Sequence, residues 1–131
     1  MRYQCPRTHE GSVPAILLVD DDELGLWARA CILAHEGYRV TTATSAEEAL
    51  LKLADRFDAI ITDRDMPGMN GTELAAEVRR RRIGAPIIML SGRIDLSPSD
   101  LADTDASLCK GDGPSRLLRV IDDVLDRIWV A

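Results

Sequence analysis

The sequence has little cysteine, and its cysteines are not arranged as a disulfide framework or a metal site. Cys5, Cys31 and Cys109 are far apart, form no CxxC pair and leave one thiol over in any pairing. Disulfide-stapled secreted domains and thiolate zinc sites need paired or closely spaced cysteines. The two histidines, His9 and His35, also lack metal-ligand spacing. The cysteine pattern is typical of reduced thiols in a cytoplasmic protein.

The sequence also lacks a long apolar run and an excess of basic residues. No segment has the apolar length of a membrane span, and residues 1–14 lack the apolar centre of a signal peptide. Acidic residues outnumber basic ones by 22 to 16, which argues against a nucleic-acid-binding surface. We therefore expect a cytoplasmic protein without membrane or direct nucleic-acid contact. A polar tail over residues 1–14 should precede one folded domain over residues 15–131.

Short apolar runs alternate with helical patterns along this domain. Isoleucine-rich and leucine-rich runs bounded by turn residues are typical of strands buried on both faces of a parallel sheet. Five alternations predict an α/β fold, doubly wound, with helices on both faces of the sheet. The predicted strands cover residues 15–19, 38–43, 57–63, 86–90 and 106–109, and the predicted helices cover residues 24–35, 45–56, 71–82, 96–103 and 114–129.

The first predicted helix carries apolar residues at helical spacing, which predicts the face that packs against the domain. We expect Trp27 in this helix and Trp129 in the last helix to serve as packing residues. The apolar residues of the first helix are Leu24, Trp27, Ala28, Cys31 and Ile32.

Polar residues stand where four of the predicted strands end. Asp20 and Asp21 follow the first strand, Asp63 ends the third, Ser91 follows the fourth and Lys110 follows the fifth. The carboxyl ends of parallel strands share one edge, where α/β proteins bind ligands. Two unit charges about 4 Å apart repel by roughly 4 kcal/mol at an effective dielectric near 20, so clustered carboxylates need a cation. Hard oxygen ligands favour Mg²⁺.

The alternative interpretation is that the three consecutive aspartates after the first strand merely cap the following helix. Capping needs only one of them, and it leaves Asp63, Ser91 and Lys110 at the same edge without an explanation.

Four motifs, in this order, resemble the receiver domain of two-component response regulators over about residues 15–129. They read ILLVDDD, DAIITDRDMPGMNG, PIIMLSG and LCKG. The resemblance implies a five-stranded sheet with the flavodoxin-like strand order 2-1-3-4-5.

The resemblance also implies a role for each residue at the predicted edge. Asp63 corresponds to the phosphoacceptor, while Ser91 and Lys110 correspond to the hydroxyl and the ammonium group that bind the phosphoryl group. The implied Mg²⁺ ligands are the carboxylates of Asp20, Asp21 and Asp63 and the backbone carbonyl of Asp65.

The partners that the resemblance implies are proteins. A sensor histidine kinase or a phosphotransfer protein would supply the phosphoryl group, and a downstream protein target would bind the changed surface. The family also allows a homodimer. Such a domain is a signalling phosphoacceptor rather than an enzyme with its own substrate.

The sequence departs from the family pattern after the fourth strand. Gly111 follows Lys110 where the family usually has proline, so we expect a trans peptide with a shifted loop, or a loop in which Gly111 and Gly113 absorb the difference. Ser107 stands where the family usually has a switching Tyr or Phe. The short connection between the fourth and fifth strands predicts an abbreviated or disordered fourth helix.

Three further questions stay open at this level. Arg64, next to the acceptor, could contact either the phosphoryl group or a neighbouring carboxylate. Ser107 and Gly111 also allow a pseudo-receiver that binds its partners constitutively. An aspartyl-nucleophile phosphatase or transferase with Asp65 as general acid is a third possibility, but the chain is short for the insertion that covers the substrate in such enzymes.

Overall fold

The computed structural model describes residues 13–92 and 96–129. It contains a five-stranded parallel sheet of order β2-β1-β3-β4-β5, which confirms the predicted fold class and strand order. The strands are β1 (Ala15–Val19), β2 (Arg39–Ala43), β3 (Ala59–Asp63), β4 (Ile87–Ser91) and β5 (Ala106–Cys109). The helices are α1 (Glu23–His35), α2 (Ala46–Lys52), α3 (Gly71–Arg80), α4 (Pro98–Leu101) and α5 (Pro114–Trp129), with a 3-10 turn at Lys110–Asp112.

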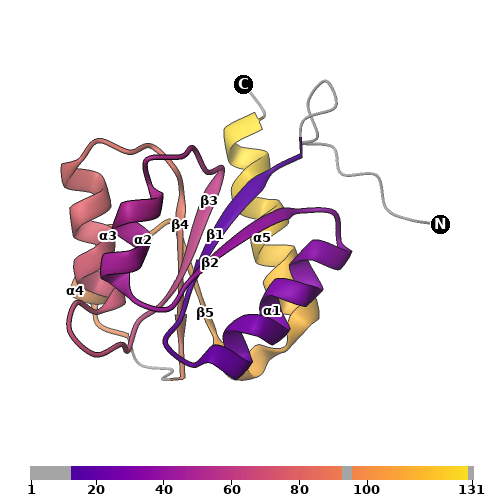
Figure 1. Ribbon diagram of the computed structural model, residues 1–131, viewed down its shortest axis with the longest axis horizontal. Helices are drawn as coiled ribbons and strands as arrows, with labels where there is room; N and C mark the ends of the chain where they lie inside the picture. The colour runs from indigo at the N-terminus through magenta and orange to yellow at the C-terminus, as the bar shows by residue number, and fades with distance from the viewer. Residues whose placement is uncertain (1–12, 93–95, 130–131) are drawn as a thin grey trace.

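The sheet separates two apolar cores. In Figure 1, α1 and α5 lie on one side of the sheet, and α2 and α3 lie on the other. Alternate side chains of a strand point to opposite faces, so Leu18 and Ile61 pack beneath α1 and α5, whereas Leu17 and Ile60 pack beneath α2 and α3. This two-sided burial explains why the central strands read as continuous apolar runs rather than as alternating patterns.

The face of α1 that packs on the sheet differs from the one that the apolar pattern predicts. Leu26 and Leu33 are buried, whereas Leu24 and Trp27 are 81% and 69% exposed and Cys31 is exposed. The helix carries two apolar stripes, and the sheet buries the one that contains the two leucines at positions 26 and 33. The prediction that Trp27 is a packing residue is therefore wrong.

Several sequence predictions fall outside the described residues. They concern residues 1–12 of the predicted tail, with Cys5 and His9, and the side chain of Trp129. None of the helices in the described ranges combines the length and the apolar character that a membrane span requires.

Candidate functional site

The register of the sheet brings the predicted polar residues to one edge. Val19 pairs with Thr62, so the residues that follow each of them, Asp20 and Asp63, stand side by side. Asp63 pairs with Leu90, which places Ser91 one residue further along the neighbouring strand. Asp20 and Ser91 are fully buried and Asp63 is 4% exposed, so these polar side chains lie within the fold at the end of the sheet.

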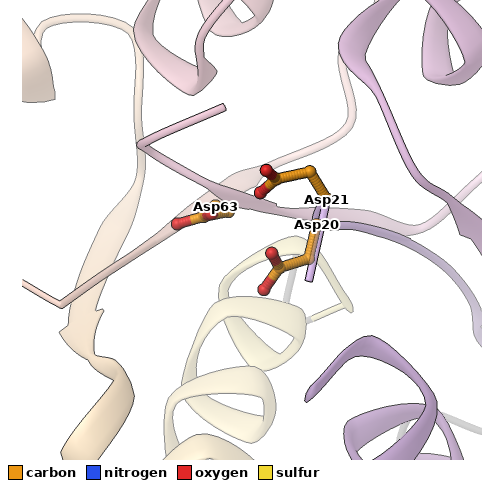
Figure 2. A group of neighbouring side chains, drawn as sticks. All are labelled: Asp20, Asp21 and Asp63. Atoms are coloured by element: carbon orange, nitrogen blue, oxygen red, sulfur yellow. The ribbon is translucent and has the colours of Figure 1, made fainter. Parts of the chain in front are cut away.

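Three carboxylates gather at this edge. Asp20, Asp21 and Asp63 each offer an oxygen, and these oxygens all lie within 4.8 Å of one another. Figure 2 shows the three side chains together, two from the end of β1 and one from the end of β3. Asp21 is exposed while the other two are buried, so the group is open to solvent on one side. An oxygen-only donor set of this spacing suits a hard divalent cation.

Lys110 reaches this cluster from the turn after β5. Its Nζ lies 2.8 Å from Oδ2 of Asp20 and 3.3 Å from Oδ2 of Asp63. The ammonium group therefore bridges the two buried carboxylates. The structure thus brings Lys110 together with the carboxylates, as the strand-end pattern predicts, and Ser91 lies at the same edge of the sheet.

The two buried carboxylates titrate in opposite directions. Burial raises the pKa of Asp63 to about 6, and the negative charge of Asp20 adds to the rise, against the opposing effect of Lys110. Burial would also raise the pKa of Asp20, but hydrogen bonds from Lys110 and from the Asp22 backbone, with the charges of Lys110 and Arg29, lower it below its ordinary value. Asp20 is therefore the firmly ionised partner, and Asp63 is the carboxylate that is destabilised by its surroundings.

The first aspartates do not act mainly as helix caps. Asp22 stands at the N-cap position of α1, yet its side chain makes no capping hydrogen bond among the described residues. Instead, its backbone N–H donates to Oδ1 of Asp20 at 2.9 Å. The capping alternative therefore fails, because the local geometry orients Asp20 toward the cluster.

Arg64 uses its side chain for ion pairs within the protein. Its Nη1 lies 2.7 Å from Oδ1 of Asp65, and its Nη2 lies 2.9 Å from Oδ1 of Asp100 in α4. The Thr72 hydroxyl of α3 donates to the same Asp100 oxygen at 3.1 Å. Of the two alternatives, the structure supports the ion pair, and it ties the loop after Asp63 to α3 and α4.

The loop after β5 is built without a cis bond, since all peptide bonds of the described residues are trans. Gly111 lies in the 3-10 turn, and Gly113 takes a positive φ of 89°, a conformation that favours glycine. The expected trans peptide is therefore confirmed, and of the two glycines Gly113, not Gly111, takes a positive φ. Ser107 is half-buried in β5, and α4 spans only four residues, which confirms the predicted abbreviated fourth helix.

Two residues that support the site were missed at the sequence level. A Cβ at Gly71 would stand 2.3 Å from the backbone oxygen of Asp63, so only glycine lets α3 begin against the end of β3. Arg29 of α1 pairs with Asp20 through Nη2 and Oδ2. The signal for Arg29 was available, because helical side chains lean toward the N-terminus of their helix and α1 begins just after Asp20.

Comparisons with known proteins agree on one family. The family model of the response regulator receiver domain matches residues 16–109. Among solved structures, a CheY-like response regulator receiver domain protein from Methanospirillum hungatei is 37% identical with a TM-score of 0.84, covering 88% of this chain and 96% of its own. The response regulator TrrA from Thermotoga maritima, in complex with Mg²⁺–BeF, is 30% identical with a TM-score of 0.75, covering 86% of this chain and 99% of its own.

A curated relative has the same family assignment but is longer. The response regulator SaeR of Staphylococcus aureus is 30% identical over 116 residues, which are 86% of this chain and 51% of that protein. The chain therefore spans about half the length of the curated relatives it matches.

Proposed function

This chain belongs to the family of response regulator receiver domains, and from that premise we propose that Asp63 accepts a phosphoryl group. The observation that carries the proposal is the setting of Asp63. It ends β3 almost fully buried, its carboxylate is disfavoured by burial and by Asp20, and Lys110 lies within 3.3 Å. Phosphorylation would replace this unfavourable carboxylate by a phosphoryl group whose oxygens can pair with the ammonium group of Lys110.

The transfer requires little covalent chemistry from the protein. An oxygen of Asp63 attacks the phosphorus of a phosphohistidine, the bond from phosphorus to the histidine nitrogen breaks, and the nitrogen leaves with the electron pair. Lys110, which already bridges Asp20 and Asp63, would pair with the phosphoryl oxygens, and the Ser91 hydroxyl would donate to them. The protein contributes position and charge, which account for most of the catalysis in such reactions.

We propose Mg²⁺ as the cation of this site. The fit is supported by the donor set, because three carboxylate oxygens lie within 4.8 Å of one another and one of the carboxylates is exposed, which leaves room for water ligands. Asp20, Asp21 and Asp63 would hold the ion, with the backbone carbonyl of Asp65 as a further ligand. When bound, Mg²⁺ would neutralise the phosphoryl oxygens as the transfer proceeds.

The partners follow from this chemistry and are part of the proposal. A sensor histidine kinase or a phosphotransfer protein would donate the phosphoryl group in the cytoplasm, and a downstream protein would bind the changed surface. Phosphorylation adds negative charge and acceptor oxygens beside Lys110, so the loop between β5 and α5 is the element that the modification would bias.

Intact mass after incubation with acetyl phosphate and Mg²⁺ tests this function. We expect the wild type to gain one phosphoryl group, and we expect no gain in Asp63→Asn or when EDTA is added before the donor. Asp123→Asn, which changes the same charge on an exposed residue of α5, is the matched control and should be labelled like the wild type. Equal labelling of Asp63→Asn would place the acceptor elsewhere. A folded wild type that binds Mg²⁺ without being labelled would favour constitutive partner binding instead.

A further inference from the structure

A second cation reaches the acidic cluster in addition to Lys110. Arg29, in the second turn of α1, places Nη2 on Oδ2 of Asp20, the same oxygen that Lys110 contacts at 2.8 Å. Asp20 is fully buried, and its other oxygen accepts the backbone N–H of Asp22. Both oxygens of this carboxylate are therefore already engaged by the protein.

The path of the Arg29 side chain is opened by a glycine. Gly25 lies one helical turn earlier, and a Cβ there would stand 3.0 Å from Arg29 Nη2 and 2.8 Å from Oδ2 of Asp22. Helical side chains lean toward the N-terminus of their helix, so any side chain at this position would crowd the guanidinium. Glycine inside a helix is less favourable than alanine. Gly25 therefore lowers the stability of α1 but leaves room for the guanidinium of Arg29.

The guanidinium is incompletely bonded where it lies. Among the described residues, the buried Nε of Arg29 has no hydrogen-bond partner. The side chain also lines a cavity of about 210 Å³ between α1 and the β5–α5 region, together with Ile32 and Leu117. The Arg29 side chain is 17% exposed, so it lies between the buried carboxylate of Asp20 and solvent.

The charge balance shows what the second cation does. The cluster of Asp20, Asp21 and Asp63 carries three negative charges, and Lys110 with Arg29 supplies two positive ones. A divalent ion added to this arrangement meets a site that is already largely neutralised, at a carboxylate whose oxygens are occupied. A cation in direct contact with a metal ligand opposes metal binding through Coulomb repulsion.

We propose that Arg29 is a built-in competitor of Mg²⁺ for Asp20, a positioning residue that holds the metal ligand in the absence of the ion and must release it when the ion binds. This inference rests on the proposed Mg²⁺ site. It makes the metal affinity of this chain depend on a residue of α1, and it couples occupancy of the site to the position of a side chain in the cavity between α1 and α5.

Calorimetric titration of the metal-free protein with MgCl₂ at constant ionic strength tests the competition. We expect Arg29→Met, which keeps the length of the stem but removes the charge, to bind Mg²⁺ about tenfold more tightly than the wild type. Arg39→Met, at the amino end of β2 and the opposite end of the sheet, is the matched control and should change the dissociation constant by less than about twofold. Circular dichroism and thermal melts establish that each variant is folded.

A second variant covers the case in which Arg29→Met does not fold. Gly25→Ala keeps the arginine but crowds its guanidinium, so we expect Mg²⁺ to bind about two to three times more tightly while helix propensity improves. A folded Arg29→Met that binds Mg²⁺ no more tightly than the wild type overturns the inference. If only Gly25→Ala is folded, unchanged affinity in that variant does the same.

The outcomes also separate this inference from the proposed function. Equal Mg²⁺ binding by the wild type and Arg29→Met leaves the proposed site intact and removes only the competitor role. If Mg²⁺ binds to Arg29→Met and not to the wild type, Arg29 excludes the ion from the site completely, which supports the inference. Absence of Mg²⁺ binding in every folded variant contradicts the proposed metal site, and the competitor role falls with it.

Discussion

At the scale of single residues, the site is a balance between buried carboxylates and the cations that reach them. Asp20 has Arg29, Lys110 and a backbone N–H as partners. Within the described part of the chain, Asp63 is paired with Lys110 and receives a long contact of 3.3 Å from the Asp65 backbone N–H. The residue that we propose as the acceptor is therefore the less well compensated one. Because of this difference, the ionised form of Asp63 is unfavourable in the folded protein, and side chains with such shifted pKa values are typical of functional sites.

This imbalance predicts a pH-dependent gain in stability for Asp63→Asn in metal-free buffer. The pKa of Asp63 rises from 3.8 to about 6 on folding. Below pH 3.8 the residue is therefore protonated in the folded and the unfolded state and does not lower the free energy of unfolding. The decrease in this free energy grows between pH 3.8 and 6 and is complete above pH 6, where the folded protein holds a buried carboxylate. Removing that carboxylate should stabilise the protein by about 2 kcal/mol at pH 7.5.

Urea unfolding of the wild type and Asp63→Asn at pH 4 and pH 7.5, in EDTA, measures this difference. The gain should nearly vanish at pH 4, and Asp123→Asn should show no comparable pH dependence. A gain of equal size at both pH values would mean that burial does not raise the pKa of Asp63.

At the scale of elements, one face of α1 packs in the core, while another face exposes apolar residues. Its buried residues, Leu26 and Leu33, pack under the sheet with α5, while Leu24 and Trp27 point to solvent. Arg29 is half-buried, and its guanidinium pairs with Asp20 in the acidic cluster. The same helix therefore contributes to the core, to the acidic cluster and to the exposed surface.

Two leucines of α1 provide a matched pair that tests this orientation. Leu26→Ala should lower the free energy of unfolding by about 3 kcal/mol, because it leaves a cavity in the core. Leu24→Ala makes the same chemical change on an 81% exposed residue and should cost less than about 0.5 kcal/mol. Chemical denaturation of both variants decides the orientation, and a larger loss for the residue at position 24 would contradict it.

At the scale of the whole molecule, the sheet divides the protein into two cores and gathers the polar residues at one end. At that end, the register of β1 and β3 sets Asp20 beside Asp63. The chain spans about half the length of its curated relatives.

We propose that the folded unit is independent of residues 1–12. The backbone oxygen of Pro14 accepts the N–H of Arg39, so the unit must include Pro14, one residue before the predicted boundary at residue 15. A chain that begins at Val13 should keep its free energy of unfolding within about 0.5 kcal/mol and its labelling at Asp63. A chain that begins at Leu18 loses three of the five residues of β1 and should not fold. Thermal melts and mass labelling of both truncations measure this, and a large loss in the longer one would extend the domain.

The sequence by itself determined the sheet, its order and the residues at its carboxyl edge. Short uninterrupted apolar runs bounded by turn residues, such as that ending at Asp63, are typical of strands buried on both faces. Parallel strands share one edge, so local patterns located Asp20 and Lys110 at that edge. The motifs then supplied the family and its strand order. These features follow from short segments of chain, which is why they could be predicted without coordinates.

Only the tertiary structure decided which groups pair and which face of α1 is buried. The helix has two apolar stripes, and the choice of the stripe with Leu26 depends on contact with the sheet and α5. The pairing of Arg64 with Asp100 joins residues 36 positions apart, one in the loop after β3 and the other in α4. Such contacts are fixed by where separate elements meet in space, and the periodicity of the sequence carries no information on that.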